Sequence, residues 1–334
     1  MRATLPSAVE VMPGGTSGFP HFWAGRAGSY DLVLVSRPHN KAMVNAVLAR
    51  SSPPLPRIVY DAEAVNSFRD LGLLRHLRQD PSPRYERRLL AREMRLVDPS
   101  VAVVAVCEAE ARVFTEHCLQ AVSVLGHALD PAPSPRPHER RRGLLFVGAI
   151  SDAACPNLYA ASWLSNEVFP RFLSRLGGNV QLVLAGSNLS DYLRPMSPAI
   201  DMRGPTEDLA ELYDQVRVFV APAPFGAGIP LKVLDAAAHG VPVVASSLLA
   251  RQLGWRDGVE LLVAHDAESF AAQCARLYDD AALWHRLREA ALARVGSDYS
   301  PSAFSATLGQ IVEAALAAPA PVATSVSRKS TRWP

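Results

Sequence analysis

Residues 217–246 read RVFVAPAPFGAGIPLKVLDAAAHGVPVVAS, and this stretch decides the fold. An apolar run of the strand type, Val218 to Val220, leads into a loop rich in glycine and proline, residues 222–230. A helical pattern begins near Leu231 and ends at Gly240, and the apolar run VPVV follows. A buried strand, a glycine loop, a helix and a second buried strand predict a β-α-β unit of a parallel sheet.

The loop and the first turns of this helix suit an anionic ligand. Gly226 and Gly228 let the backbone approach a ligand closely or adopt positive φ, and the free N–H groups at a helix start favour phosphate. Lys232 adds a cation that we expect to be exposed, and Asp235 follows one turn later on the same side. This spacing could hold the diphosphate and the ribose of one nucleotide. The alternative is an ordinary crossover in which Lys232 and Asp235 form a surface pair.

The same alternation of strands and helices extends along most of the chain. It predicts strands at 32–36, 57–60, 101–106, 121–125, 143–147, 180–185, 199–203, 217–221, 241–245 and 260–263. It predicts helices at 39–50, 62–79, 84–97, 157–175, 206–214, 231–239, 266–278, 280–295 and 301–317, and a further helix ending near 118. The fold class is therefore α/β, with parallel sheets that bind ligands at the carboxyl ends of their strands.

Composition divides the chain into six segments. We expect an irregular lead-in over 1–29, a short Rossmann-like domain over 30–129, and a Pro/Arg-rich linker over 130–142 (DPAPSPRPHERRR). A Rossmann-like ligand-binding domain over 143–300, a C-terminal helix over 301–317 and a disordered tail over 318–334 complete the chain.

Composition and short motifs argue against several classes of protein. The chain has 334 residues, of which 49% are hydrophobic, and a formal net charge of +2, which gives no bulk electrostatic case for nucleic acid. The first 30 residues lack a basic start followed by an apolar core, and no apolar run reaches the 18 residues of a membrane helix. The four cysteines have no metal-type spacing and no D-x-D pair occurs. We expect a cytoplasmic protein without a metal site, and a GC-rich bacterial source.

The stretch GAGIPLKVLDAAAHGVPVVAS resembles the donor-site signature of retaining glycosyltransferases of family 4 (glycosyl transferases group 1), which have the GT-B fold. It is most similar to the branch with the motif G-A-G-I-x-x-K-V-L-[ED]. Segments 144–170, 180–187, 202–222 and 250–271 follow in the order of that family's donor domain. YDLVLVSRPHN, IVYDAEAV and VAVVAVCEAEARVF resemble the later part of its acceptor domain, which implies a shortened first domain.

The resemblance implies which residues bind the donor. The expected donor-binding residues are Gly148, Arg203, Phe225, Gly226, Gly228, Ile229, Lys232, Val233 and Asp235. No cofactor is implied, because a nucleotide-diphosphate sugar serves as co-substrate. The chain departs from the family pattern at Asp235, which is usually Glu, and at Ala227, where the family usually has a Glu that touches the sugar. Residues 149–157 also lack the Arg and Lys that many members use to grip the diphosphate.

Two features of the first half keep alternatives open. Asp61 and Glu63 end a predicted strand and are the candidate catalytic carboxylates, although Asp61 could equally cap a helix with Glu63 in its first turn. The Arg-rich residues 69–97 could contact anionic lipid at the inner face of the membrane, or form an ordinary solvated helical face.

The sequence as a whole predicts a metal-independent, retaining, hexosyltransferase-like enzyme. It would transfer sugar from a nucleotide sugar to a glycan, lipid-linked sugar or small molecule, in cell-surface glycan or exopolysaccharide synthesis. The alternative is a catalytically impaired relative that binds a nucleotide or a partner protein. Because a sheet beginning at Leu32 would leave an edge exposed, a homo-oligomer, a partner or a membrane contact is also expected to cover the first half.

Overall fold

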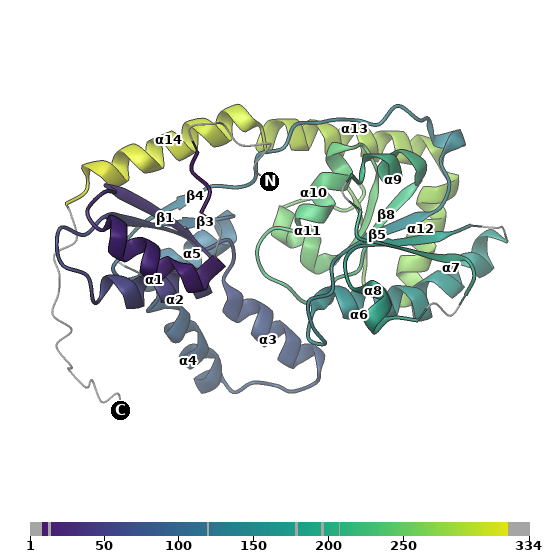
Figure 1. Cartoon of the computed structure of the whole chain (residues 1–334). Coiled ribbons are helices and arrows are strands. Elements are labelled where there is room, and N and C mark those ends of the chain that lie inside the picture. The colour runs from purple at the N-terminus through teal and green to yellow at the C-terminus, as the bar shows by residue number, and fades with distance from the viewer. Residues whose placement is uncertain are drawn as a thin grey trace. The chain divides into compact units, whose positions relative to one another are not determined.

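The computed structural model describes residues 9–12, 15–118, 120–177, 180–194, 197–206 and 208–319. These residues form two compact units. Unit 1 contains the described residues of 1–63, 88–124 and 308–334, and unit 2 contains those of 64–87 and 125–307. Each unit is built on its own parallel sheet (Figure 1).

Unit 2 has a six-stranded parallel sheet in the order β10-β9-β8-β5-β6-β7. Its strands are β5 (Leu144–Val147), β6 (Leu182–Ala185), β7 (Ile200–Gly204), β8 (Val218–Ala221), β9 (Val243–Ser246) and β10 (Leu262–Ala264). The order reverses at β5, which pairs with β6 on one side and β8 on the other. Open sheets of this kind bind ligands at such a switch point, beyond the carboxyl ends of the strands. All six strands lie within or next to the predicted ranges.

Apolar side chains pack on both faces of this sheet because successive residues of a strand point to opposite faces. Leu144 and Phe146 belong to one core, whereas Leu145 belongs to the other. The covering helices are α6 (Pro156–Trp163), α7 (Phe169–Leu176), α9 (Ala210–Gln215), α10 (Leu231–Ala238), α11 (Ser247–Leu253), α12 (Ala267–Asp279) and α13 (Ala281–Asp298). The short helices α8 (Leu189–Tyr192) and α11 were not predicted from the sequence.

The helix predicted over 157–175 is continuous but not uniform. A π-helical turn, Leu164–Val168, joins α6 to α7. Pro170 lies at the start of α7 and has no N–H to donate to the preceding turn. A local widening at such a proline lets the helix continue.

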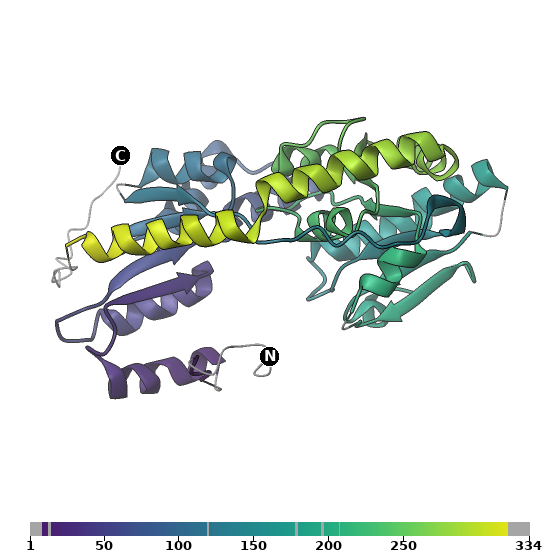
Figure 2. The ribbon, with the colours of Figure 1, turned by 90° about the horizontal axis from the view of Figure 1, so that it is seen from above.

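Unit 1 has a four-stranded parallel sheet in the order β1-β2-β3-β4. The strands are β1 (Leu32–Ser36), β2 (Arg57–Asp61), β3 (Ala102–Ala105) and β4 (Ala121–Val124), as predicted. The helices α2 (Pro38–Leu48) and α5 (Glu108–His117) connect strands of this sheet, and the C-terminal end of α14 (Pro301–Ala317) belongs to the same unit. Figure 2 shows that end of α14, in yellow, running beside the strands of unit 1. The strand β1 lies at the sheet edge, and Leu34 within it is exposed.

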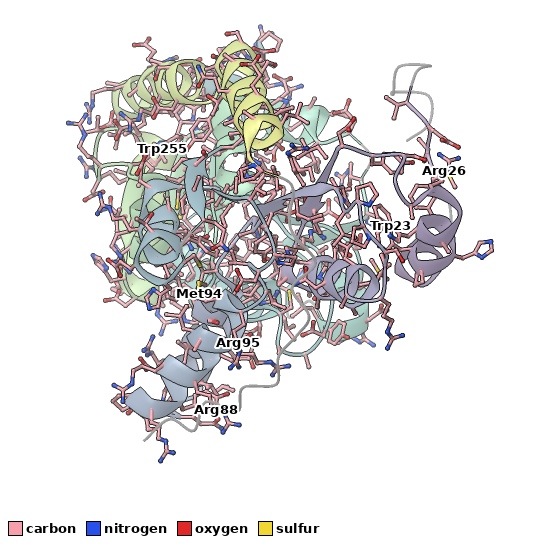
Figure 3. All side chains as sticks on the ribbon, turned by 90° about the vertical axis from the view of Figure 1, so that its left-hand side faces the viewer. Trp23, Arg26, Arg88, Met94, Arg95 and Trp255 are labelled. Carbon is pink, nitrogen blue, oxygen red and sulfur yellow. The ribbon has the colours of Figure 1, made fainter. Side chains whose placement is uncertain are left out.

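The expectation of an irregular lead-in over 1–29 is wrong for residues 15–26, which form helix α1 (Gly15–Arg26). Its glycines and Pro20 have weak helix propensity, so the sequence pattern did not predict it. The helix forms because its aromatic residues pack on a core. Trp23 is buried among residues of α2, β1 and β2, and its indole N–H donates to the Ser51 hydroxyl at 2.9 Å. Phe19 stacks on Trp23. In Figure 3, Trp23 lies on the inner side of α1, and Arg26 lies at the upper end of the helix.

The segment 130–142 is not a free linker. The side chain of Arg141 is fully buried in unit 2 and donates to the carbonyl oxygens of Tyr213, Val216, Ser134 and Arg136 at 2.6–3.3 Å. Burial lowers the pKa of Arg141 to about 10. Because Arg141 donates to carbonyl groups of residues 213 and 216 as well as to those of its own segment, it fixes a stretch with no apolar pattern to unit 2.

The described helices α3 (Asn66–His76) and α4 (Pro83–Met94) complete the fold. Although the sequence placed residues 64–87 with the first domain, they group with unit 2, because α3 packs against its glycine loop. Among the described residues, no helix is both long and apolar enough to cross a membrane. The predicted tail lies outside the described residues from position 320 onward.

Candidate functional site

The predicted glycine loop joins β8 to α10 at the carboxyl end of the unit 2 sheet. Gly228 adopts a φ of +76°, which a residue with a side chain rarely adopts. Ile229 packs on the core and Val233 is fully buried, so the side chains of these two predicted site residues serve packing. Among the described atoms, none would approach a Cβ on Gly226 within 4 Å, so the loop is open at that position.

Lys232 is mostly buried, which corrects the expectation of an exposed first-turn lysine. Its amine donates to Asn157 Oδ1 at 2.5 Å and lies 4.7 Å from the centroid of the Phe146 ring. Burial lowers the pKa of Lys232 to about 8, while the neighbouring Cys155 thiol opposes that shift. The amine therefore stays largely protonated at neutral pH in a partly dehydrated setting, where its charge acts strongly on an anion.

Asp235 does not form the surface pair with Lys232 that was the alternative to a binding site. Its Oδ2 accepts the Tyr213 hydroxyl proton at 2.8 Å, and its Oδ1 lies 3.6 Å from His239 Nδ1. The rings of Tyr213 and His239 stack with centroids 4.7 Å apart. Burial, with the nearby Asp235 carboxylate, raises the pKa of Tyr213. The carboxylate is thus held in one orientation and remains partly exposed.

Gly148 lies where β5 ends and brings three elements together. Its N–H donates to the Ala185 carbonyl at 2.9 Å, and a Cβ added to Gly148 would lie 2.8 Å from Asn157 Cγ. Across the sheet, a Cβ on Gly186 would lie 2.2 Å from the Gly148 carbonyl oxygen. The ends of β5 and β6 therefore approach so closely that only glycine fits.

An aromatic cluster lines one side of the loop. Phe225 is buried, and its ring contacts the rings of His76 and Tyr159 with centroids 5.6 Å apart in both cases. The rings of His76 and Tyr159 are 5.0 Å apart, edge to face. Gly72 of α3 lies directly against Phe225 Cβ. The cluster fixes the position of Phe225 and the start of the loop.

Arg203, a predicted donor-binding residue, pairs with a residue of its own strand. It is an exposed residue of β7, and its guanidinium pairs with the Asp201 carboxylate at 2.5 Å, which raises the pKa of Arg203. This contact matches the alternative of a solvated charge near the end of a strand. Its part in donor binding stays a prediction.

Asp61 and Glu63 lie at the carboxyl end of the unit 1 sheet. Asp61 accepts hydrogen bonds from the Ser36 hydroxyl at 2.9 Å and the Glu63 N–H at 3.2 Å. Glu63 pairs with Arg37 through both carboxylate oxygens, at 2.9 and 3.0 Å. Both Arg37 and Glu63 have positive φ, 76° and 54°, which costs free energy and is common at functional sites. Asp61 precedes α3 by several residues and does not cap it, since Val65 holds that position. A catalytic role for either carboxylate stays a prediction.

Two residues of this site were missed by sequence reasoning, Asn157 and Tyr213. Asn157 could have been suspected because an amide follows a proline at a helix start beside the first strand of the domain. The contact of Tyr213 with Asp235 spans 22 residues and left no local signal. Among the described residues, no group of three His, Cys, Asp or Glu side chains could hold a metal ion.

A family model matches the part of the chain that contains much of this site. Residues 141–280 match the family model described as glycosyl transferases group 1. This range contains the glycine loop, Lys232, Asn157 and Asp235.

A curated relative matches a comparable length of chain. It is an uncharacterized 44.6 kDa protein in a cps region of Klebsiella pneumoniae, 29% identical over 138 residues. The match covers 38% of this chain and 35% of that protein, so the chain matches about a third of the relative's length.

Solved structures resemble most of the chain. HepE of Anabaena, in complex with UDP and glucose, has a TM-score of 0.68 at 14% identity and covers 90% of this chain and 83% of its own. Sucrose-phosphate synthase of Thermosynechococcus elongatus has a TM-score of 0.68 at 15% identity, with 95% and 83% covered. These similarities and the two parallel sheets confirm a GT-B-like fold.

Proposed function

We propose that this chain is a glycosyltransferase that takes a sugar from a nucleoside diphosphate sugar. The observation that carries the proposal is the position of the Lys232 amine, at the start of α10 and hydrogen-bonded to Asn157, which lies against Gly148 where β5 ends. A cation beside a helix start at the switch point of the sheet suits a diphosphate. The family match over 141–280 supports the reaction, and the UDP bound to HepE supports a uridine nucleotide as the first to test.

The chain's own residues would act mainly by position and charge. Lys232 and the N–H groups of the loop would stabilise the negative charge that develops on the departing diphosphate. Asp235, oriented by Tyr213, would accept hydrogen bonds from the ribose hydroxyl groups. The finer expectations belong to this proposal: retention of configuration, independence of metal, and the candidate catalytic residues Asp61 and Glu63. The Klebsiella relative, from a cps region, supports an acceptor in polysaccharide synthesis.

The first test is thermal unfolding with a panel of nucleoside diphosphates and their sugars. A ligand at 100 times its dissociation constant adds about 2.7 kcal/mol of stability. In a unit of this size this should raise the melting temperature by roughly 5–10 °C. The variant Lys232→Met should lose the shift, while Arg171→Met, at an exposed pair on α7, should keep it. If no nucleotide of the panel shifts the parent's melting temperature at millimolar concentration, the proposal is wrong.

The second candidate function is a catalytically impaired relative that binds a nucleotide or a partner. Ala227 in the loop favours it, because most of the family has a carboxylate at that position to contact the sugar, although the G-A-G-I branch also lacks it. Slow hydrolysis of the donor distinguishes the two functions without a known acceptor. Release of free sugar with EDTA present would favour a metal-independent enzyme, and its anomeric form by NMR would test retention. Nucleotide binding without any release would favour the second function.

A further inference from the structure

The Lys232 amine has an amide as its hydrogen-bonding partner where the resemblance leads one to expect cationic neighbours. Asn157, near the start of α6, accepts from Lys232 Nζ at 2.5 Å and donates from Nδ2 to the Ala149 carbonyl at 2.8 Å. One small side chain therefore connects the end of β5 to the start of α10. Asn157 follows Pro156, which occupies the first turn of α6.

These two contacts define which residue can occupy position 157. The Ala149 carbonyl oxygen needs a hydrogen-bond donor, and the Lys232 ammonium group needs an acceptor. The side chain at position 157 must therefore carry both a donor and an acceptor. Aspartate would turn an oxygen toward the Ala149 carbonyl and would neutralise the lysine. Serine is too short to reach both partners. An apolar side chain would leave the buried ammonium without its hydrogen bond, which is costly. Of these choices, only the amide satisfies both contacts and leaves the lysine's charge intact.

The backbone around Asn157 makes room for this side chain. Because Gly148 has no Cβ, Asn157 can lie directly against it, and any larger residue at 148 would enter the space of the amide. Gly148 is held in turn by its hydrogen bond to Ala185 and by the close approach of Gly186. The position of Asn157 is thus determined by two strands and one helix.

We propose that Asn157 is a positioning residue that holds the Lys232 amine, still charged, at the carboxyl end of β5 for the diphosphate of the donor. The identity of the ligand rests on the proposed function, whereas the control of Lys232 by Asn157 does not. When the ligand binds, phosphate oxygens complete the hydrogen bonding of an amine that a neutral partner has oriented without cancelling its charge.

The electrostatics of the site agree with this role. Burial lowers the pKa of Lys232 to about 8. Among the described residues, the titratable group found to act on the amine is the Cys155 thiol, at the start of the same helix as Asn157. Burial acts to raise the pKa of that thiol, but hydrogen bonds from Ser151 and from the backbone of residues 157 and 158 outweigh burial and lower it. Cys155→Ala therefore serves as a control for the contribution of the thiol.

The chain offers a direct measurement of this lysine, because it has three lysines, Lys41, Lys232 and Lys329. Protein labelled with 13C at lysine Cε gives three signals, and Lys232→Met identifies the signal of interest. Asn157→Asp should raise the pKa of Lys232 by at least ~1 unit, because an opposite charge within hydrogen-bonding distance favours the ammonium form. Asn157→Ser should lower it, because the charged form loses a hydrogen bond. Asn166→Asp, at an exposed position of the same helical stretch, is the matched control and should change nothing. The Lys41 signal is the internal reference.

Affinity for UDP gives the second measurement. In the parent, UDP affinity should fall by up to ~10-fold per pH unit above about 8, as Lys232 loses its proton. Both Asn157 variants should bind UDP about 10-fold more weakly at pH 7, because serine loses one hydrogen bond to the charged amine and aspartate offsets the positive charge of Lys232. In Asn157→Asp the fall with pH should begin at a higher pH. Asn166→Asp should bind as the parent does.

The pKa measurement tests the positioning role, and the affinity measurement tests the proposed ligand. If Lys232 titrates at the same pH in the parent and in both Asn157 variants, the positioning role is overturned, even if UDP binds. If the Lys232 pKa moves as expected and UDP does not bind to the parent, Asn157 does control the lysine, and the proposed nucleotide ligand is wrong.

Discussion

Replacing Lys232 by methionine should weaken ligand binding and raise the stability of the fold, because burial of a charged amine costs folding free energy. The pKa of Lys232 is about 8 in the folded protein and about 10.4 in an unfolded chain. The difference of about 2.4 units, at 1.36 kcal/mol per unit, is about 3 kcal/mol of folding free energy that the charged amine costs below pH 8. Methionine has a similar length and carries no charge, so it removes this cost.

The sign of the pH dependence follows from the direction of the shift. Because the folded pKa lies below the unfolded one, the unfolded chain binds more protons between about pH 8 and 10.4. The parent's free energy of unfolding should therefore rise by up to about 3 kcal/mol across that window through this one group. The variant Lys232→Met lacks this rise. The difference in stability between variant and parent should therefore be largest near pH 7 and shrink as the pH increases.

The assay is urea unfolding followed by tryptophan fluorescence. Of the five tryptophans, three lie in unit 2, so the substitutions Trp23→Phe and Trp333→Phe restrict the signal to that unit. Parent and Lys232→Met are compared in this background at pH 7, 8, 9 and 10. The same variant should bind UDP at least 10-fold more weakly at pH 7, for loss of a charge-assisted hydrogen bond. Stability curves that stay parallel from pH 7 to 10 would refute the burial of a charged Lys232.

Three further substitutions test other parts of unit 2. Gly186→Ala should cost about 1–3 kcal/mol of unfolding free energy in urea, because its Cβ would overlap a backbone oxygen, whereas Gly254→Ala, also at positive φ but in open space, should cost less. Tyr213→Phe should weaken UDP binding by roughly tenfold in calorimetry, for loss of the hydrogen bond that orients Asp235, and unchanged affinity would contradict that role. Limited trypsin digestion should leave residues 130–142 intact in the parent and cleave them in Arg141→Met, since Arg141 fixes this segment; early cleavage of the parent would contradict that.

The strands and the donor loop could be predicted from the sequence because their signals are local. Short apolar runs separated by helical periods define each strand, and all ten described strands lie in or beside predicted ranges. The start of α10 followed from Pro230 and the end from Gly240. A buried parallel sheet requires such continuous apolar runs, so the pattern and the fold have one physical cause.

The parts that the sequence did not predict are held by contacts between distant residues. Helix α1 contains Pro20 and weak helix formers, and it folds because Trp23 has a core to enter. Residues 130–142 have no apolar pattern, yet Arg141 buries its guanidinium among carbonyl groups more than 70 residues away in sequence. Helix α3 was assigned to the wrong half because nothing in its own sequence shows that Phe225 packs on Gly72.

The environment of Lys232 also explains why lysine remains there in a chain that favours arginine. Of 34 basic residues three are lysine, and each of the two in the described part of the chain has an asparagine oxygen 2.5 Å from its amine; Lys41 is fully buried and Lys232 is half-buried. An ammonium group is compact and can be satisfied by one amide oxygen and an aromatic face. A guanidinium has five donors in a rigid plane and stays charged at any accessible pH, so it needs several acceptors, as Arg141 has. The contacts described around the Lys232 amine are one amide oxygen, from Asn157, and the Phe146 ring, which are too few acceptors for a guanidinium. A diphosphate would add acceptors only while it is bound. Lysine is therefore the cation that this site can bury when empty and still use when a ligand arrives.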